Sequence, residues 1–210
     1  MAVKNQLGRV LMYLVRHALV DLDVEERIRG TQNVPLNKEG EEEAAELEDF
    51  FRDIPIAAVY SDDLDRTYHT AIAIAEPHGL RVKKDILLRS WDVGSDLEGK
   101  SIEAHKSEIR EFKLQPHLIP TGGESWADCE DRALQTLTKY TMIALEYGKP
   151  IVLVLHGSLL QLLWHHMGQD EAEADYDHTP IEPSGVIAVY GTRNGYRTRI
   201  LRDAKEAVDA

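Results

Sequence analysis

Three short apolar runs, each followed at once by polar residues, constrain the fold of this chain more than any other feature. The runs are Val10–Val15, Ile56–Tyr60 and Ile151–Leu155. Strands that are buried on both faces have this pattern, and such strands occur in parallel sheets covered by helices. The stretches between the runs contain segments with helical periodicity. The pattern therefore predicts an α/β fold with a largely parallel sheet.

Capping and turn signals extend this prediction along the chain. Asn37 can cap a helix over Lys38–Phe51, and Gly79 can stop a helix over Leu64–Pro77. Asn194-Gly195 is a hairpin signal. The remaining expected elements are a short strand within Arg81–Leu87, helices over Ser101–Phe112, Ser125–Tyr147 and Leu159–Met167, and hairpin strands over Ser184–Tyr190 and Tyr196–Arg202. We expect a single three-layer domain over residues 1–210, with a mostly parallel mixed sheet, helices on both faces and a C-terminal β-hairpin.

Charge and cysteine content narrow the classes of partner. The formal net charge of −13 disfavours binding to nucleic acid or to an anionic membrane surface. One cysteine, Cys129, cannot form an internal disulfide and fits a reducing compartment. The first residues lack the apolar core of a signal peptide. We therefore expect a cytoplasmic protein, and the sequence is compatible with a homodimer.

The polar residues that follow the three runs are chemically alike. Arg16-His17 follows the first run, Ser61–Arg66 follows the second, and His156-Gly157-Ser158 follows the third. Ligand sites of open α/β sheets form at the carboxyl ends of the strands. If the three strands are parallel neighbours, these side chains converge on one crevice.

Two arginines and two histidines in one crevice favour a phosphate site. The guanidinium group matches phosphate oxygens, and Arg66 falls in the first turn of its helix, where free backbone N–H groups also attract anions. Neighbouring positive charge keeps His17 neutral, so it can attack phosphorus and form a phosphohistidine. A protonated His156 would stabilise the developing charge. This chemistry needs no metal and no cofactor.

These residues stand in segments that resemble the motifs of the histidine phosphatase superfamily, in the branch that includes phosphoglycerate mutases and related phosphatases. The segments are LVRHALV (residues 14–20), SDDLDRTYHTA (61–71), PTGGES (120–125) and LHG (155–157). The resemblance implies that His17 is the phosphorylated nucleophile. It implies that Arg16, Arg66 and His156 hold the phosphoryl group and that Arg27 contacts substrate near the entrance.

Ser90 departs from the family pattern at the position of a glutamate that protonates the leaving group. A serine hydroxyl is too weak an acid for that task. The nearby carboxylates that could replace it are Asp92, Asp96, Glu98 and Glu124. Asp92 is favoured because it is closest in the loop, although a turn role for it is equally open. Glu124 is also a candidate for substrate binding.

Asp23 is a second departure, because the family usually has an asparagine there that donates to phosphate. A carboxylate cannot donate and would repel the anion. The hypothesis is that Asp23 pairs with Arg27 or Arg29 and positions it.

The sequence favours hydrolysis of a small phosphomonoester. The segment Leu88–Glu124 is short and lacks the E-R-H-Y-G stretch typical of mutases. Mutase-type phosphoryl transfer remains an alternative, as does a catalytically weak protein that binds a phosphorylated ligand or partner. A metal hydrolase is disfavoured because no histidines show spacing such as H-E-x-x-H. Specificity is expected from the loops at Arg89–Glu98, Lys113–Glu124 and Gln169–Pro183.

Overall fold

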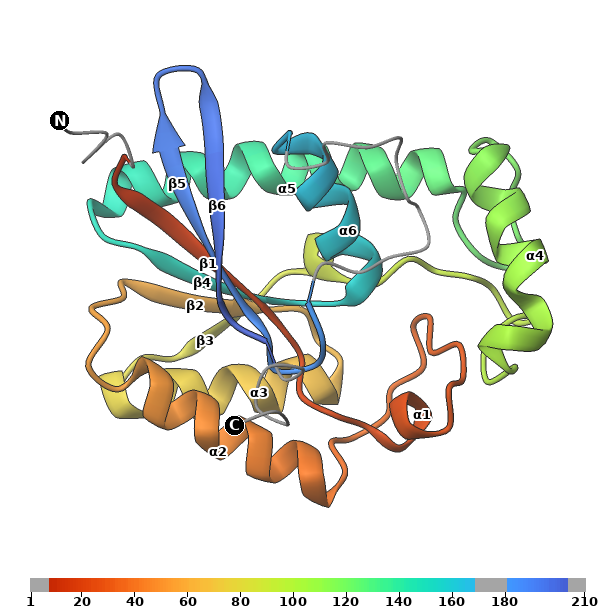
Figure 1. The fold of residues 1–210 in the computed structure, drawn as a ribbon, viewed down its shortest axis with the longest axis horizontal. Coiled ribbons are helices and arrows are strands. Elements are labelled where there is room, and N and C mark those ends of the chain that lie inside the picture. Colours follow the sequence, from red (N-terminus) through yellow and green to blue (C-terminus); the bar gives the residue numbers. More distant parts are fainter. Residues whose placement is uncertain (1–7, 169–180, 204–210) are drawn as a thin grey trace, which may run out of the picture.

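The computed structural model describes residues 8–168 and 181–203, which fold around one mixed sheet (Figure 1). The strand order is β3-β2-β4-β1-β5-β6. Pairing is parallel from β3 to β1 and antiparallel for β1 with β5 and for β5 with β6. The strands are β1 (Val10–Arg16), β2 (Ala58–Ser61), β3 (Val82–Lys84), β4 (Ile151–Leu155), β5 (Val186–Thr192) and β6 (Gly195–Arg202). The predicted α/β fold, with its C-terminal hairpin, is confirmed.

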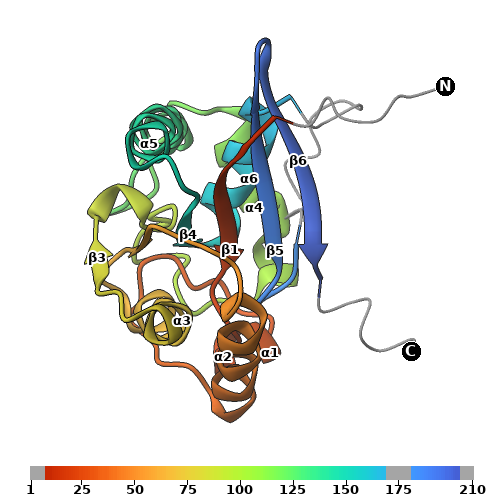
Figure 2. The same ribbon diagram turned by 90° about the vertical axis from the view of Figure 1, so that its left-hand side faces the viewer.

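Helices cover both faces of the sheet (Figures 1 and 2). One layer contains α2 (Lys38–Phe51) and α3 (Asp65–Ala75), and the other contains α5 (Trp126–Tyr147) and α6 (Gly157–His166). The short helix α1 (Asp21–Val24) follows β1, and α4 (Ile102–Leu114) stands at the side toward which β1 and β4 point. Among the described residues, no helix combines the length and apolarity needed to cross a membrane.

The alternating side chains of β4 divide the core between the two faces of the sheet. Ile151, Leu153 and Leu155 pack on the α5 and α6 side, whereas Val152 and Val154 pack on the α2 and α3 side. All five are fully buried. Each such aliphatic side chain contributes about 1.5–3 kcal/mol by leaving water. This is why a strand between two helical layers is apolar at every position.

Most helix ends lie where the sequence signals predict them. The Asn37 side chain accepts a hydrogen bond from Gly40 N at 2.8 Å, and Ser125 Oγ accepts one from Asp128 N at 3.1 Å. Gly79 and Gly148 adopt left-handed conformations, with φ of 62° and 65°. Glycine reaches these angles without strain and so ends both helical segments.

Several element boundaries differ from the predictions. The helix expected over 64–77 ends at Ala75 and continues as a 3-10 turn, Glu76–His78. Helix α6 begins at Gly157, two residues earlier than predicted, because His156 keeps extended angles and occupies the N-cap position. The hairpin turn is Arg193-Asn194, since Thr192 pairs with Gly195.

Candidate active site

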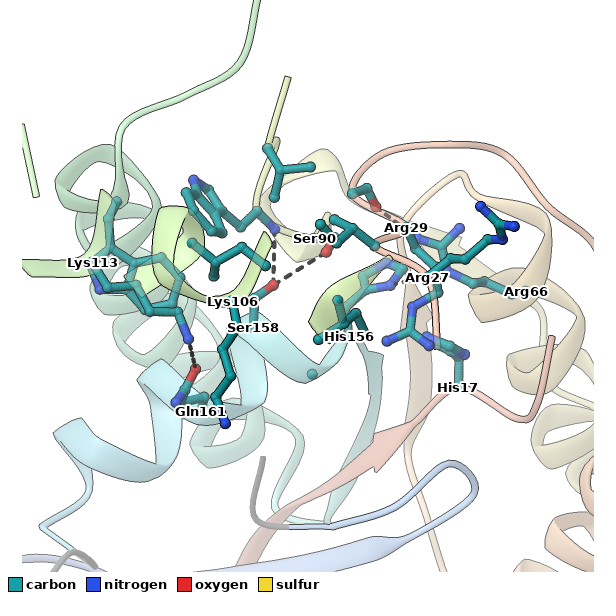
Figure 3. A pocket seen from close by; sticks show the side chains of 18 of the residues that line it. His17, Arg27, Arg29, Arg66, Ser90, Lys106, Lys113, His156, Ser158 and Gln161 are labelled. Carbon is teal, nitrogen blue, oxygen red and sulfur yellow. Dashed lines mark hydrogen bonds between the residues drawn. The ribbon is translucent and has the colours of Figure 1, made fainter. Parts of the chain in front are cut away.

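The carboxyl ends of β1, β2 and β4 meet at one edge of the sheet and bring three of the predicted site residues together, namely His17, Arg66 and His156. Arg16 pairs with Leu155 across the parallel β1–β4 ladder, so the next residues, His17 and His156, are neighbours. Their ring centroids lie 5.2 Å apart. Arg66, from the start of α3, joins them around a common cavity (Figure 3).

His17 is buried and held in one tautomer. Its Nδ1 lies 2.8 Å from Ala18 O, a carbonyl that can only accept, so Nδ1 carries the proton and Nε2 keeps its lone pair. Burial lowers the pKa of His17 well below its ordinary value, and the positive charges of Arg66 and Arg29 add to this. The ring is therefore neutral near pH 7 and has a nitrogen able to attack phosphorus.

Neighbouring helices fix the backbone that follows His17. Ala18 N donates to Thr70 Oγ1 at 3.1 Å, and Leu19 N donates to a Glu43 carboxylate oxygen at 2.8 Å. These bonds tie the loop after β1 to α3 and α2. A side chain held in this way loses little freedom when a ligand binds.

Arg66 is fully buried and joins three parts of the site. Its guanidinium donates to Gln32 O at 2.6 Å, to Gly30 O at 3.0 Å and to His156 Nδ1 at 3.3 Å. Burial lowers its pKa to about 10, so it remains positively charged near neutral pH. Arg66 thus provides fixed positive charge and holds the loop that contains Gly30 over the cavity.

His156 is held between Arg66 and a carboxylate that the sequence analysis did not single out, Asp62. Asp62 Oδ2 lies 2.6 Å from His156 Nε2. Because Nδ1 accepts from Arg66, the proton of the neutral ring is on Nε2. Burial lowers the pKa of His156 to about 4, Arg66 contributes to this lowering, and Asp62 opposes both effects. The unliganded ring is therefore neutral, whereas the sequence interpretation considered it protonated.

Asp62 is itself buried and bonded on both oxygens. Oδ1 accepts a hydrogen bond from Leu64 N at 3.1 Å and another from the Thr67 hydroxyl. Burial raises the pKa of Asp62, but His156 and these bonds outweigh it and leave the pKa below its ordinary value. The signal that could have found Asp62 is its place in the polar run directly after the second apolar run.

Asp23 balances part of the positive charge of the site. It forms ion pairs with Arg29 and, at 3.6 Å, with Arg16. The hypothesis of a pairing with Arg29 is confirmed, while Arg27 pairs with Glu25 instead. Burial and the nearby cations lower the pKa of Arg29 to about 9. The sequence pattern did not indicate Arg29 as a cavity residue, although it stands two residues after Arg27.

Arg16 and Arg27 occupy very different environments. Arg16 is buried, donates to Ile181 O at 3.0 Å, and has an Nε with no hydrogen-bond partner among the described residues. A buried donor of this kind can be satisfied by a ligand oxygen. Arg27 is exposed, donates to Gly99 O at 2.8 Å and lines the cavity.

Ser90 lines the cavity, but the carboxylates proposed to replace its acid do not. Ser90 Oγ lies 3.2 Å from Ser158 Oγ, which also accepts from Trp91 N at 3.0 Å. The Asp92 carboxylate accepts from Gly94 N, as in a turn. Glu124 forms an ion pair with Arg132. Asp92 and Glu124 are thus placed in local structural contacts, away from the cavity lining.

The two other carboxylates near Ser90 are also outside the lining. Glu98 accepts hydrogen bonds from Thr31 N at 2.6 Å and from Thr31 Oγ1 at 3.0 Å, and Asp96 does not line the cavity either. In the described part of the chain, the cavity-lining carboxylate is Glu103, at the start of α4. Glu103 was not among the carboxylates that the sequence pattern indicated.

The cavity measures about 300 Å³ and extends from His17 to α4. Figure 3 shows His17, Arg29 and Arg66 on one side of Ser90 and Ser158, and Lys106, Lys113 and Gln161 on the other. Within residues 8–168 and 181–203, no cluster of three or more histidine, cysteine, aspartate or glutamate side chains is arranged to hold a metal ion. The residues Gln169–Pro180 of the third predicted specificity loop lie outside the described part.

Comparisons with known proteins agree with this geometry. A family model of the histidine phosphatase superfamily (branch 1) matches residues 12–204. A Salmonella typhi protein named "Probable phosphoglycerate mutase GpmB" is 34% identical over 158 residues, which is 72% of each chain.

Two solved structures share the fold. The mycobacterial glucosyl-3-phosphoglycerate phosphatase superposes with a TM-score of 0.73 at 23% identity, covering 91% of this chain and 97% of its own. The protein TTHB049 from Thermus thermophilus superposes with a TM-score of 0.67 at 27% identity, covering 91% and 96%. The first of these likenesses is evidence for the fold alone.

Proposed function

The chain belongs to the histidine phosphatase superfamily, and we propose that it hydrolyses phosphomonoesters through a phosphohistidine on His17. The observation that carries the proposal is the state of the His17 ring. Its Nδ1 is engaged by Ala18 O, and its pKa is held below the ordinary value, so Nε2 has a free lone pair at neutral pH. Arg66 and Arg29 line the same cavity and supply positive charge for a phosphoryl group.

The proposed reaction has two steps. In the first, His17 Nε2 forms a bond to phosphorus while the bond to the ester oxygen breaks, and the leaving group departs with that oxygen and its electron pair. In the second, a water oxygen attacks phosphorus, the phosphorus–nitrogen bond breaks and the water proton passes to solvent. Inorganic phosphate and neutral His17 result. Arg29, Arg66 and His156, which line the cavity, hold the phosphoryl group in both steps, whereas Arg16, expected from the sequence to do the same, is outside the cavity lining.

We propose that no carboxylate of the loop after Ser90 protonates the leaving group. The carboxylate of Asp92 bonds to Gly94 N, and Glu124 pairs with Arg132. An alkoxide needs a proton as it leaves, whereas a nitrophenolate is stable without one. The reaction should therefore be faster with acidic leaving groups. Arg27, at the cavity lining, remains our candidate for contact with the rest of the substrate.

The test is the release of phosphate from p-nitrophenyl phosphate by wild type and by His17→Ala, with excess chelator present. Wild type should turn over and carry acid-labile phosphate on histidine after a rapid quench, and His17→Ala should do neither. His69→Ala is the matched control, because His69 is an exposed histidine on α3. No trapped phosphate and no His17-dependent turnover would reject the proposal.

Mutase-type phosphoryl transfer is the second candidate, because the relative at 34% identity carries a mutase name. Incubation with 3-phosphoglycerate, followed by phosphorus NMR, separates the two. Hydrolysis gives inorganic phosphate, whereas transfer gives 2-phosphoglycerate with the total ester conserved. We favour hydrolysis because the segment between Leu88 and Glu124 is short.

We also propose a reducing compartment such as the cytoplasm as the place of action. Cys129 is a free, buried thiol in the core on the α5 side. Burial raises its pKa, so the unreactive thiol form dominates. Cell fractionation tests this directly.

A further inference from the structure

One face of α4 borders the part of the cavity that the proposed reaction does not use. Ile102, Lys106, Ile109 and Lys113 are spaced by four, three and four residues, which places them in one stripe along the helix. All four line the cavity. The stripe thus presents alternating apolar and cationic side chains to whatever occupies this space.

At the cationic end of the cavity, the Lys113 side chain is held by contacts within the protein. Lys113 Nζ donates to Gln161 Oε1 at 3.2 Å and lies 5.0 Å from the centre of the Trp126 ring. Figure 3 shows Lys106 and Lys113 reaching toward Gln161, on the far side of Ser158 from His17 and Arg66. Within the described part of the chain, Lys106 has no ion-pair partner.

Apolar side chains form a large part of the cavity wall. Trp91, Val93 and Trp126 line the cavity together with the two isoleucines of α4, and the hydroxyls of Ser90 and Ser158 are bonded to each other. A volume of about 300 Å³ is near the lower limit for small-molecule sites. The cavity therefore suits a small ester with an apolar body.

The cavity is lined by two lysines of α4 in addition to the arginines that stand beside the reacting phosphate. Arg29 and Arg66 already stand beside His17, while Lys106 and Lys113 lie at the other end. Glu103 is the lining carboxylate on α4, so the helix contributes a net positive charge to the cavity. In a chain with a net charge of −13, a local positive excess on a cavity wall marks a place for an anion.

We propose that Lys106 and Lys113, with Gln161, bind a second anionic group of the substrate. The substrate would then be a phosphate monoester with a short apolar body and a carboxylate or second phosphate at its far end. The proposal rests on the proposed function for the assignment of the first phosphate to His17. It adds the substrate class and assigns specificity to α4.

Binding of phosphonates, which cannot be hydrolysed, tests this without turnover. The probes are 4-(2-carboxyethyl)phenylphosphonate, its carboxamide, and the analogue with a second phosphonate in place of the carboxylate. The carboxamide keeps the shape and removes the charge. Calorimetry should show that at least one anionic probe binds about tenfold more tightly than the carboxamide. Comparing the two anionic probes identifies which anion is preferred.

The variant is the double substitution Lys106→Met and Lys113→Met, which keeps the alkyl chains and removes both charges. The preference for the anionic probe over the carboxamide should fall to within about twofold of equality. Lys149→Met is the matched control, because Lys149 is exposed and lies outside the cavity lining, and it should keep the preference.

The remaining outcomes distinguish failure of the second-anion site from failure of the proposed function. If neither anionic probe binds more tightly than the carboxamide, or if a preference survives the double variant, the second-anion site is overturned, and His17-dependent turnover of p-nitrophenyl phosphate would still uphold the proposed function. If no phosphonate binds and no His17-dependent turnover occurs, both proposals are overturned.

Discussion

Asp62 Oδ2 lies 2.6 Å from His156 Nε2, so a buried carboxylate orients the second histidine of the cavity. The other nitrogen of the same ring accepts from Arg66 at 3.3 Å. A bound phosphate dianion would favour a proton on His156, and Asp62 would then stabilise the resulting imidazolium. Asp62 is therefore a positioning residue for the phosphate site, since its contacts run through His156.

Asp62→Asn should lower kcat/KM for p-nitrophenyl phosphate by roughly 10–100-fold, a size typical of partners that orient a functional histidine. An amide has one acceptor oxygen where the carboxylate has two. It must give up either the bond to His156 or the bonds from Leu64 N and the Thr67 hydroxyl. The pH profile of kcat/KM should shift as well, which a purely structural loss would not cause.

Asp63→Asn is the matched control for that variant. Asp63 is adjacent in sequence but forms a partly exposed ion pair with Arg89, at 2.6 Å. Pairs of this kind contribute about 0–1 kcal/mol. If Asp63→Asn lost as much activity as Asp62→Asn, the role assigned to Asp62 would be wrong.

The unliganded protein should lose stability as the pH falls from 6.5 toward 4. The unfolded chain takes up protons on histidine near pH 6.5, whereas the folded pKa of His156 is about 4 and that of His17 is also lowered. In this window the unfolded state binds more protons, so the free energy of unfolding decreases with falling pH. The lowered pKa of His156 alone accounts for a total decrease of about 3 kcal/mol in the free energy of unfolding.

Urea unfolding at pH 7.5 and 4.5 measures this loss. His17→Asn should show a smaller difference between the two pH values than wild type does. His69→Asn, at an exposed site, should match wild type. If the free energy of unfolding of His17→Asn differed between the two pH values by as much as that of wild type, the loss could not be assigned to the buried His17.

Asp23→Asn should tighten the binding of inorganic phosphate by roughly tenfold, because it removes a negative charge next to Arg16 and Arg29. It should also lower the free energy of unfolding, since the buried Arg16 and the partly buried Arg29 then lose their shared partner. Competitive inhibition by phosphate and urea unfolding provide the two readouts. Weaker phosphate inhibition in Asp23→Asn would contradict this reading of Asp23.

Ser90→Glu should place an acid at the position where the family has one and raise the rate on alkyl phosphates relative to p-nitrophenyl phosphate. General acid catalysis is worth roughly 100–10,000-fold, so a gain of about tenfold in this ratio is a modest expectation. Ser90→Gln has nearly the same shape without the acid and should show no gain. Equal ratios for the two variants would show that proton donation does not limit the reaction.

Local sequence patterns predicted much of the fold and the site residues that follow the ends of the central strands. The runs that became β1, β2 and β4 are apolar throughout, and the ends of those strands must meet once the strands are parallel neighbours. That argument needs no knowledge of distant contacts. It placed His17, Arg66 and His156 in one cavity.

The part of the site formed by α4 and by the loop after β3 could not be predicted in this way, because contacts between residues far apart in sequence shape it. Arg132 donates to Arg89 O at 2.6 Å and to Ser90 O at 3.1 Å, so a residue of α5 sets the path of the loop after β3. Among the described residues, the carboxylate that lines the cavity, Glu103, comes from α4 and not from that loop. The substrate, the oligomeric state and the location in the cell stay predictions.

The strand order has a consequence for how activity arises during folding. Strand β4 lies between β2 and β1, although both precede it by about ninety residues or more in the chain. Before β4 is synthesised and inserted, β1 and β2 lack the neighbour that joins them, and His17 lacks His156. Because pairing over such separations forms slowly, the catalytic centre should be among the last features to form. The proposed phosphatase activity, followed in a refolding experiment, would then report completion of the central sheet, and a partly folded chain would lack it.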